Sequence, residues 1–166
     1  MAELTNLESK LGEVVGLAMA AQEAGQKVTK LAKDDGNDEL VRKLELMRDE
    51  AKETEARGTE VAGSFEGKKT AILGEAREVK QKAQKMMKTY LDEASDSLDG
   101  FEFLTMAEAG EVGHWEILSA LNDRAHRGDV SELVNWALPI QKRHLDTVRT
   151  ASLALASKED PNETSS

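Results

Sequence analysis

The apolar residues of this chain recur every three or four positions, and scarcely any segment alternates apolar and polar residues. Such spacing places the apolar side chains along one face of an α-helix. The periodic stretches are long, and the 166 residues include only 2 prolines, so few positions force a break. The pattern therefore predicts an all-α protein and argues against a β-sandwich, which needs many short strands and turns.

Five helical segments follow from this periodicity and from the glycines and polar runs that interrupt it. They span about residues 4–33, 39–62, 68–94, 101–126 and 131–156. Because the links between them are short, we expect neighbouring helices to run antiparallel and four of them to form a bundle. The third segment contains Gly74 and many lysines, so we expect it to cross over or to pack on the outside. Its Met86, Met87 and Tyr90 are expected to fill irregular space in the core.

The helical part, residues 1–157, is predicted to be one domain. The polar stretch 158–166, which includes Pro161, is predicted to be a disordered C-terminal tail. The first ten residues carry acidic side chains and no apolar run, so no secretory signal is expected. No stretch approaches the roughly 20 apolar residues that cross a bilayer. These features favour a cytoplasmic location.

The charge of the chain limits its partners. Lys and Arg number 22 against 32 Asp and Glu, for a net charge of −10. Phosphate backbones and anionic membranes repel such a chain, so neither a nucleic acid nor a membrane is expected as a partner. Aromatic residues, at 4%, are also too few for a base-stacking surface. The absence of cysteine excludes disulfides, zinc–thiolate sites, iron–sulfur clusters and cysteine nucleophiles.

Two of the three histidines fall at positions that the helical periodicity reserves for apolar residues. On the fourth segment the predicted core face consists of Leu104, Ala107, Leu118, Leu121 and Ala125. Glu111 and His114 share this face, while His144 lies at the centre of the apolar face of the fifth segment, with Gln141 beside it. Burying a carboxylate or an imidazole is costly unless a partner satisfies it, so we expect Glu111, His114 and His144 to meet in the core. Helical phase makes Glu50 the best further carboxylate, from the second segment.

The spacing of these residues suits a metal ion. Glu111-x-x-His114 places a carboxylate and an imidazole on adjacent turns of one helix, so that both can bind the same ion. These donors suit iron, manganese or zinc. Gln141-x-x-His144 repeats the spacing with a neutral amide in place of the carboxylate. Two E-x-x-H elements and a glutamate from each of two further helices form a carboxylate-bridged dinuclear site, and here only one of the two elements is intact.

The stretch from Ala107 to Leu118, AEAGEVGHWEIL, resembles the E-x-x-H-x-E-I element of ferritin-like proteins, and especially the small bacterial stress-associated branch of YciF type. Residues 50–54, EAKET, are similar to the H-x-x-E-T element of that branch, with Glu50 in the place of the histidine. The resemblance implies an antiparallel ferritin-like four-helix bundle with one additional helix, often a homodimer. It also implies a centre of two iron or manganese ions and a role in the stress response.

The departures from that pattern change the expected chemistry. By motif, Glu111, His114 and His144 carry over as metal ligands. Gln141 replaces a charged bridging ligand, and Gln22 occupies the core face of the first helix where a carboxylate is expected. Two divalent ions would then lack negative charge, which argues against ferroxidase-type catalysis and for one ion or none.

Two interpretations remain open from the residues. In the first, Glu111, His114, His144 and Glu50 hold one or two transition-metal ions in the core. In the second, the protein is a non-catalytic structural or partner-binding bundle in which these side chains only hydrogen-bond to one another in a metal-free site. No catalytic residue is predicted in either case. Alanine-rich apolar faces with few large residues favour additional burial in a homodimer.

Overall fold

The structure, a computed structural model, describes residues 2–164, and this part of the chain contains five α-helices and no strand. The helices are α1 (Asn6–Asp34), α2 (Asp38–Gly63), α3 (Lys69–Tyr90), α4 (Ser97–Ala125) and α5 (Gly128–Ala156). The all-α expectation is therefore confirmed. Between residues 2 and 164, none of the helices has the length and apolar character needed to cross a membrane.

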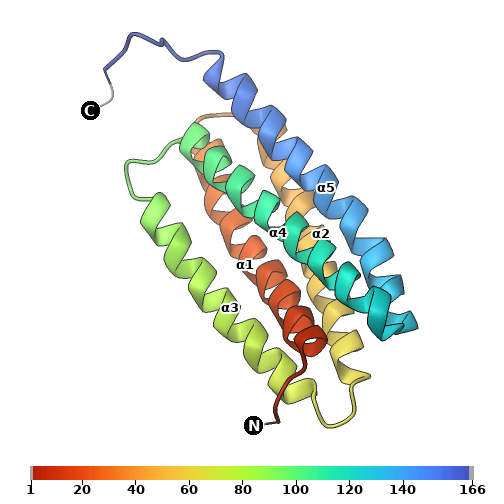
Figure 1. Cartoon of the computed structure of the whole chain (residues 1–166). Coiled ribbons are helices and arrows are strands. Elements are labelled where there is room, and N and C mark those ends of the chain that lie inside the picture. The colour runs from red at the N-terminus through yellow and green to blue at the C-terminus, as the bar shows by residue number, and fades with distance from the viewer. Residues whose placement is uncertain (1, 165–166) are drawn as a thin grey trace.

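Four of the helices form an antiparallel bundle, and consecutive helices run in opposite directions (Figure 1). α1 packs against α2 and α4, and α5 closes the ring by contacting α4 and α2. α3 lies outside this ring, mainly against α1, and returns the chain along the length of the bundle from the end of α2 to the start of α4. The third segment was expected either to cross over or to pack on the outside, and α3 does both.

α4 begins at Ser97, earlier than the expected position 101. Asp96 and Asp99 form a capping box, in which each side chain accepts a hydrogen bond from the backbone N–H of the other, so the polar link becomes the first turn of the helix. Gly100, expected to interrupt the helix, lies inside it. A Cβ atom there would stand 2.9 Å from a methyl carbon of Val28, so only glycine fits this contact with α1.

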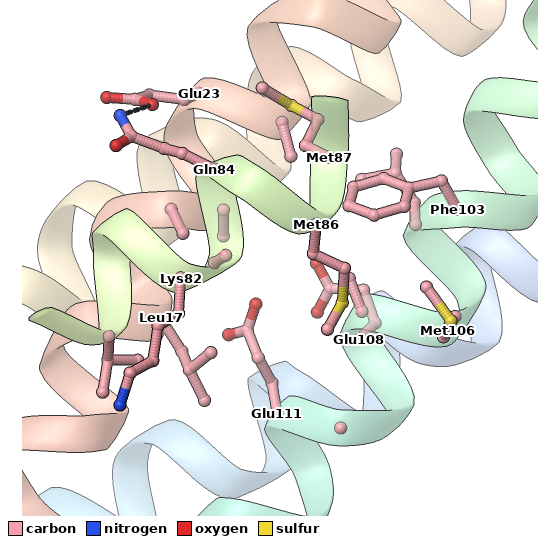
Figure 2. Close-up of a pocket in the computed structure, with 18 of the residues that line it drawn as sticks. Leu17, Glu23, Lys82, Gln84, Met86, Met87, Phe103, Met106, Glu108 and Glu111 are labelled. Atoms are coloured by element: carbon pink, nitrogen blue, oxygen red, sulfur yellow. Dashed lines mark hydrogen bonds between the residues drawn. The ribbon is translucent and has the colours of Figure 1, made fainter. Parts of the chain in front are cut away.

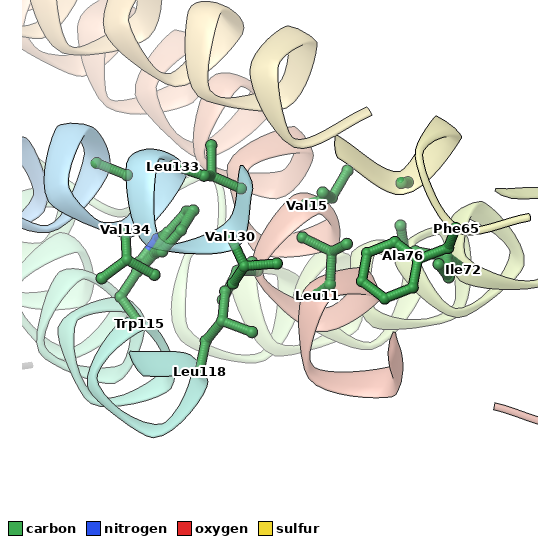
Figure 3. Close-up of a cluster of buried hydrophobic side chains, with 13 residues drawn as sticks. Leu11, Val15, Phe65, Ile72, Ala76, Trp115, Leu118, Val130, Leu133 and Val134 are labelled. Atoms are coloured by element: carbon green, nitrogen blue, oxygen red, sulfur yellow. The ribbon is translucent and has the colours of Figure 1, made fainter. Parts of the chain in front are cut away.

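The core of the bundle has two apolar clusters, one toward each end. The first joins the start of α1 to the end of α4 and the start of α5, and in it Trp115 lies beside Val134 while Leu11 lies beside Phe65 (Figure 3). The second lies toward the opposite end and is centred on residues such as Phe101. The two clusters share no residue, and the layer between them is polar.

The buried face of α4 is rotated from the predicted one. Its buried positions follow heptad spacing through Phe101, Leu104, Glu108, Glu111, Trp115, Leu118 and Asn122. Ala125 is exposed and His114 is only half-buried, so both expectations were wrong. Large aromatic and aliphatic side chains set the phase because each buries far more apolar surface than an alanine. Consequently Glu108, and not His114, joins Glu111 on the core face.

The first half of α3 packs directly on the backbone of α1. Gly12 and Gly16 of α1 face it one turn apart, and a Cβ atom at Gly16 would stand 2.3 Å from the carbonyl oxygen of Ala76. Farther along α3 the side chains are more exposed, and the predicted core residues Met86 and Tyr90 are 50% and 58% exposed. The expectation that these two residues fill core space was wrong, because α3 touches α4 only sparsely.

After α5 the chain continues in turns, and residues 157–164 are exposed. The backbone hydrogen bonds of this stretch join residues that are close together in the sequence. This stretch contains most of the predicted tail. Ser165 and Ser166, the rest of that tail, lie outside the described residues. The core thus ends with α5, near the predicted domain boundary.

We predict that Gly16→Ala will lower the free energy of unfolding by about 1–3 kcal/mol, because the added methyl group overlaps the backbone of α3. Urea denaturation measures the change. Gly113→Ala is the matched control: Gly113 also lies within a helix, but no other atom lies within 4 Å of its Cβ position. The free energy of unfolding of the control should increase by roughly 0.5–1 kcal/mol, because alanine has a higher helix propensity than glycine. Equal effects of the two substitutions would contradict the close contact between α1 and α3.

Candidate functional site

Five polar side chains from three helices form a layer between the two apolar clusters, here called the polar layer. It consists of Glu50 from α2, Glu108 and Glu111 from α4, and Gln141 and His144 from α5. The last four are at most 3% exposed, and the side chain of Glu50 is 16% exposed. The predicted burial of Glu111, Gln141 and His144 is therefore confirmed, and three helices deliver polar groups to one level of the core.

Gln141 joins the two buried carboxyl groups. With its amide turned to satisfy both neighbours, its nitrogen donates to Oε2 of Glu108 at 3.0 Å and to Oε2 of Glu111 at 3.3 Å. Pairing with a common donor lowers the cost of burying two acidic groups side by side. The Gln141 amide, where a carboxylate was expected, thus bridges the two buried carboxyl groups.

His144 connects α5 to both α2 and α4. Its Nε2 lies 3.2 Å from Oε1 of Glu50, within hydrogen-bond distance. Its Nδ1 lies 3.8 Å from Oε2 of Glu108, which is too long for a hydrogen bond. Burial lowers the pKa of His144, although the hydrogen bond to Glu50 opposes this effect. The imidazole is therefore neutral near pH 7, the form in which it can offer a nitrogen lone pair.

Glu50 stands at the edge of the layer, where Arg143 holds it. Both terminal nitrogens of Arg143 donate to the Glu50 carboxylate, at 2.9 and 2.5 Å. This pairing is the main reason why the pKa of Glu50 lies below its ordinary value. Glu50 is thus a charged group whose negative charge is already balanced, and it orients the ring of His144.

Glu108 and Glu111 have no such partner. Among residues 2–164, no lysine or arginine lies within ion-pair distance of either carboxyl group. Burial raises the pKa of Glu108 to about 8. Burial, and then the nearby Glu108 charge, raise the pKa of Glu111 well above its usual range. Without a bound cation, this pair of acids retains protons at pH values where an exposed glutamate is ionised.

A mostly apolar pocket lies between α1, α3 and α4 and leads to the acid pair (Figure 2). Its volume is about 340 Å³. The Glu111 carboxyl group points into the pocket, and Glu108 lies farther along the same wall. Met86 and Met106 also line it and are 50% and 41% exposed, so the pocket opens to solvent. The acid pair, Glu108 and Glu111, therefore lines a pocket that opens on the side of the bundle that α3 covers incompletely.

His114, predicted as a metal ligand, does not belong to the polar layer. Its Nδ1 lies 3.1 Å from Oε2 of Glu13 and 3.1 Å from Nζ of Lys10, both on α1, and its side chain is 38% exposed. Glu111 and His114 lie on adjacent turns of α4, but only Glu111 is buried, because the core face of α4 is rotated from the predicted one. The structure thus brings together three of the four predicted ligands, Glu111, His144 and Glu50.

Gln22 also lies away from the polar layer. Its amide donates to the Glu55 carboxylate at 2.5 Å and to the Ala18 carbonyl oxygen at 3.2 Å, along the interface of α1 and α2. Sequence reasoning missed Glu108. The heptad spacing of the large residues Phe101, Leu104, Trp115 and Leu118 was the signal that could have placed Glu108 in the core.

The side chains as they stand do not form a complete coordination shell. Within residues 2–164, no group of three or more His, Asp and Glu side chains is arranged to hold a metal ion. Comparisons with protein-family models, curated proteins and solved structures found no match to this chain. The interpretation of the polar layer therefore depends on its own geometry and charge.

The raised pKa values of Glu108 and Glu111 predict that the protein loses stability as the pH rises. The native state holds these protons more tightly than the unfolded chain does. The contribution to stability is complete below the ordinary carboxyl pKa and is lost as the pH rises through the raised values, about 8 for Glu108. Urea denaturation of EDTA-treated protein between about pH 5 and about pH 9 should show this decline.

The double substitution Glu108→Gln and Glu111→Gln should flatten the decline, because glutamine does not titrate. Glu116→Gln, an exposed position on the same helix, is the control and should leave it unchanged. The lowered pKa of His144 makes stability increase with pH below the ordinary pKa of histidine. This contribution is present in the unaltered protein and in both variants, so it does not affect the comparison. If stability declined equally in the double variant, Glu108 and Glu111 would not be the source of the pH dependence.

Proposed function

We propose that the polar layer binds one divalent transition-metal ion, iron or manganese, in the core of a ferritin-like bundle. The observation that carries this proposal is the acid pair, Glu108 and Glu111, buried with no lysine or arginine within ion-pair distance in residues 2–164. A neutral imidazole, His144, stands beside Glu108. Carboxylate oxygens and imidazole nitrogen are donors that iron and manganese accept, and a cation would displace the protons that the acids otherwise retain.

The architecture supports the same proposal. In ferritin-like proteins, helices of an antiparallel bundle with one long crossover project their metal ligands inward. In this chain, α3 makes the long return, and the polar groups come from the facing helices α4, α5 and α2. The stress-associated role and the homodimer stay predictions from the sequence resemblance.

The charge of the layer favours a single ion. Arg143 already neutralises Glu50, and Gln141 carries no charge, so Glu108 and Glu111 supply the available negative charge. Two carboxylates balance one divalent ion but leave two such ions under-neutralised. A bound ion would supply positive charge and Lewis acidity at the acid pair. The proposal therefore assigns ion binding and no ferroxidase activity.

A metal-free structural bundle is the second candidate. The hydrogen bonds of Gln141 to both carboxyl groups, and of His144 to Glu50, favour it because they satisfy much of the layer without an ion. The lack of a ready three-residue coordination shell in residues 2–164 favours it as well. In this case the layer would serve to align α2, α4 and α5, and the protein would act through its surface.

Metal titration separates the two candidates. EDTA-treated protein titrated with Mn²⁺ should bind about one ion per chain and gain thermal stability through linkage. Glu111→Gln, a substitution of nearly equal shape, should weaken binding at least about tenfold, as should Glu108→Gln. His114→Asn is the control: the side chain lies with Lys10 and Glu13 outside the layer, so binding should be unchanged.

Anaerobic titration with Fe²⁺, followed by elemental analysis, extends the test to the second metal. If neither ion binds, or if Glu111→Gln binds as well as the unaltered protein, the structural candidate is supported instead. Loss of binding in both Glu111→Gln and His114→Asn would return the ligand set to the original sequence-based one, which contains both residues.

A further inference from the structure

The geometry points to a second kind of occupant: the pocket between α1, α3 and α4 binds a small organic cation with an ammonium head against Glu111 and an apolar tail along the pocket walls. This inference extends beyond the metal proposal, since it needs no metal ion and concerns the whole pocket rather than the polar layer alone. A medium-chain primary alkylamine is the simplest molecule of this class.

The walls of the pocket suit an apolar tail. Leu17 of α1, Val79 and Met87 of α3, and Phe103 of α4 line it together with several alanines. A volume of about 340 Å³ falls within the range of small-molecule sites, which are commonly apolar with a few convergent polar groups. Burial of a hydrocarbon chain against these walls would remove apolar surface of both protein and ligand from water.

The inner end of the pocket suits a cation. The Glu111 carboxyl group points into the space, and Glu108 lies nearby (Figure 2). Hydrogen bonds to charged groups are roughly twice as strong as neutral ones, and an ammonium group can donate three of them, enough for both carboxylates. A carboxylate head would meet two acidic groups, and the chain's net charge of −10 also disfavours anions. A neutral alcohol would lie along the same apolar walls but could form no charge-assisted hydrogen bond with the two acidic groups.

The entrance of the pocket is adaptable. Met86 and Met106 stand on opposite sides of it, one on α3 and one on α4, and both are substantially exposed. Methionine side chains rearrange readily around ligands of different shape. Since α3 contacts α4 sparsely, little packing has to be broken when a ligand passes between these two helices.

Three probes with the same tail and different heads test the inference on the full chain in EDTA: octylamine, octanol and octanoate. Isothermal calorimetry should show octylamine binding at least about tenfold more tightly than octanol, with octanoate the weakest. Glu111→Gln should reduce octylamine affinity to that of octanol and leave octanol binding unchanged. Ala83→Leu, which places a larger side chain on the pocket wall, should weaken octylamine and octanol alike.

Glu116→Gln is the matched control for non-specific attraction to an acidic protein, because it removes the same charge from an exposed site on the same helix. It should keep the full preference for octylamine. Equal binding of octylamine and octanol, an unchanged preference in Glu111→Gln, or no binding of any probe would overturn the inference. Mn²⁺ binding without octylamine binding would overturn this inference alone, and octylamine binding without metal binding would overturn only the proposed metal function.

Discussion

Glu108 and Glu111 lie buried side by side at mid-height of the bundle. An ionised carboxylate in an apolar interior is costly, and a second one beside it adds repulsion. This chain meets the cost with one shared amide, from Gln141, and with retained protons, as the raised pKa values of Glu108 and Glu111 indicate. A bound cation is the remaining way to stabilise the pair, and both proposals follow from that requirement.

The polar layer also organises the bundle around it. Hydrogen bonds join Arg143 and His144 of α5 to Glu50 of α2, and the Gln141 amide of α5 donates to Glu108 and Glu111 of α4, so the layer connects these three helices. On either side of this level the apolar clusters supply hydrophobic stabilisation without polar specificity. Directional contacts at one level and non-directional packing at the others together favour a single alignment of the helices.

Access to the layer depends on an asymmetry in α3. Its first half rests against Gly12 and Gly16 of α1, where the backbones approach so closely that a methyl group would clash. Its second half lacks an equivalent contact with α4, and the pocket opens there. The same connection therefore anchors the crossover firmly at one end and leaves the acids reachable at the other.

The amino-acid pattern was enough to predict five helices, their antiparallel order, and the burial of Glu111, Gln141 and His144, because helical periodicity is a local property of each segment. The phase of α4, in contrast, depends on packing against the other helices. Alanines and large residues compete for its core face, and the packing of Trp115 and Phe101 against neighbouring helices turned Glu108 inward and His114 outward. The pocket likewise arises from the distance between α3 and α4, which depends on contacts between segments far apart in the chain.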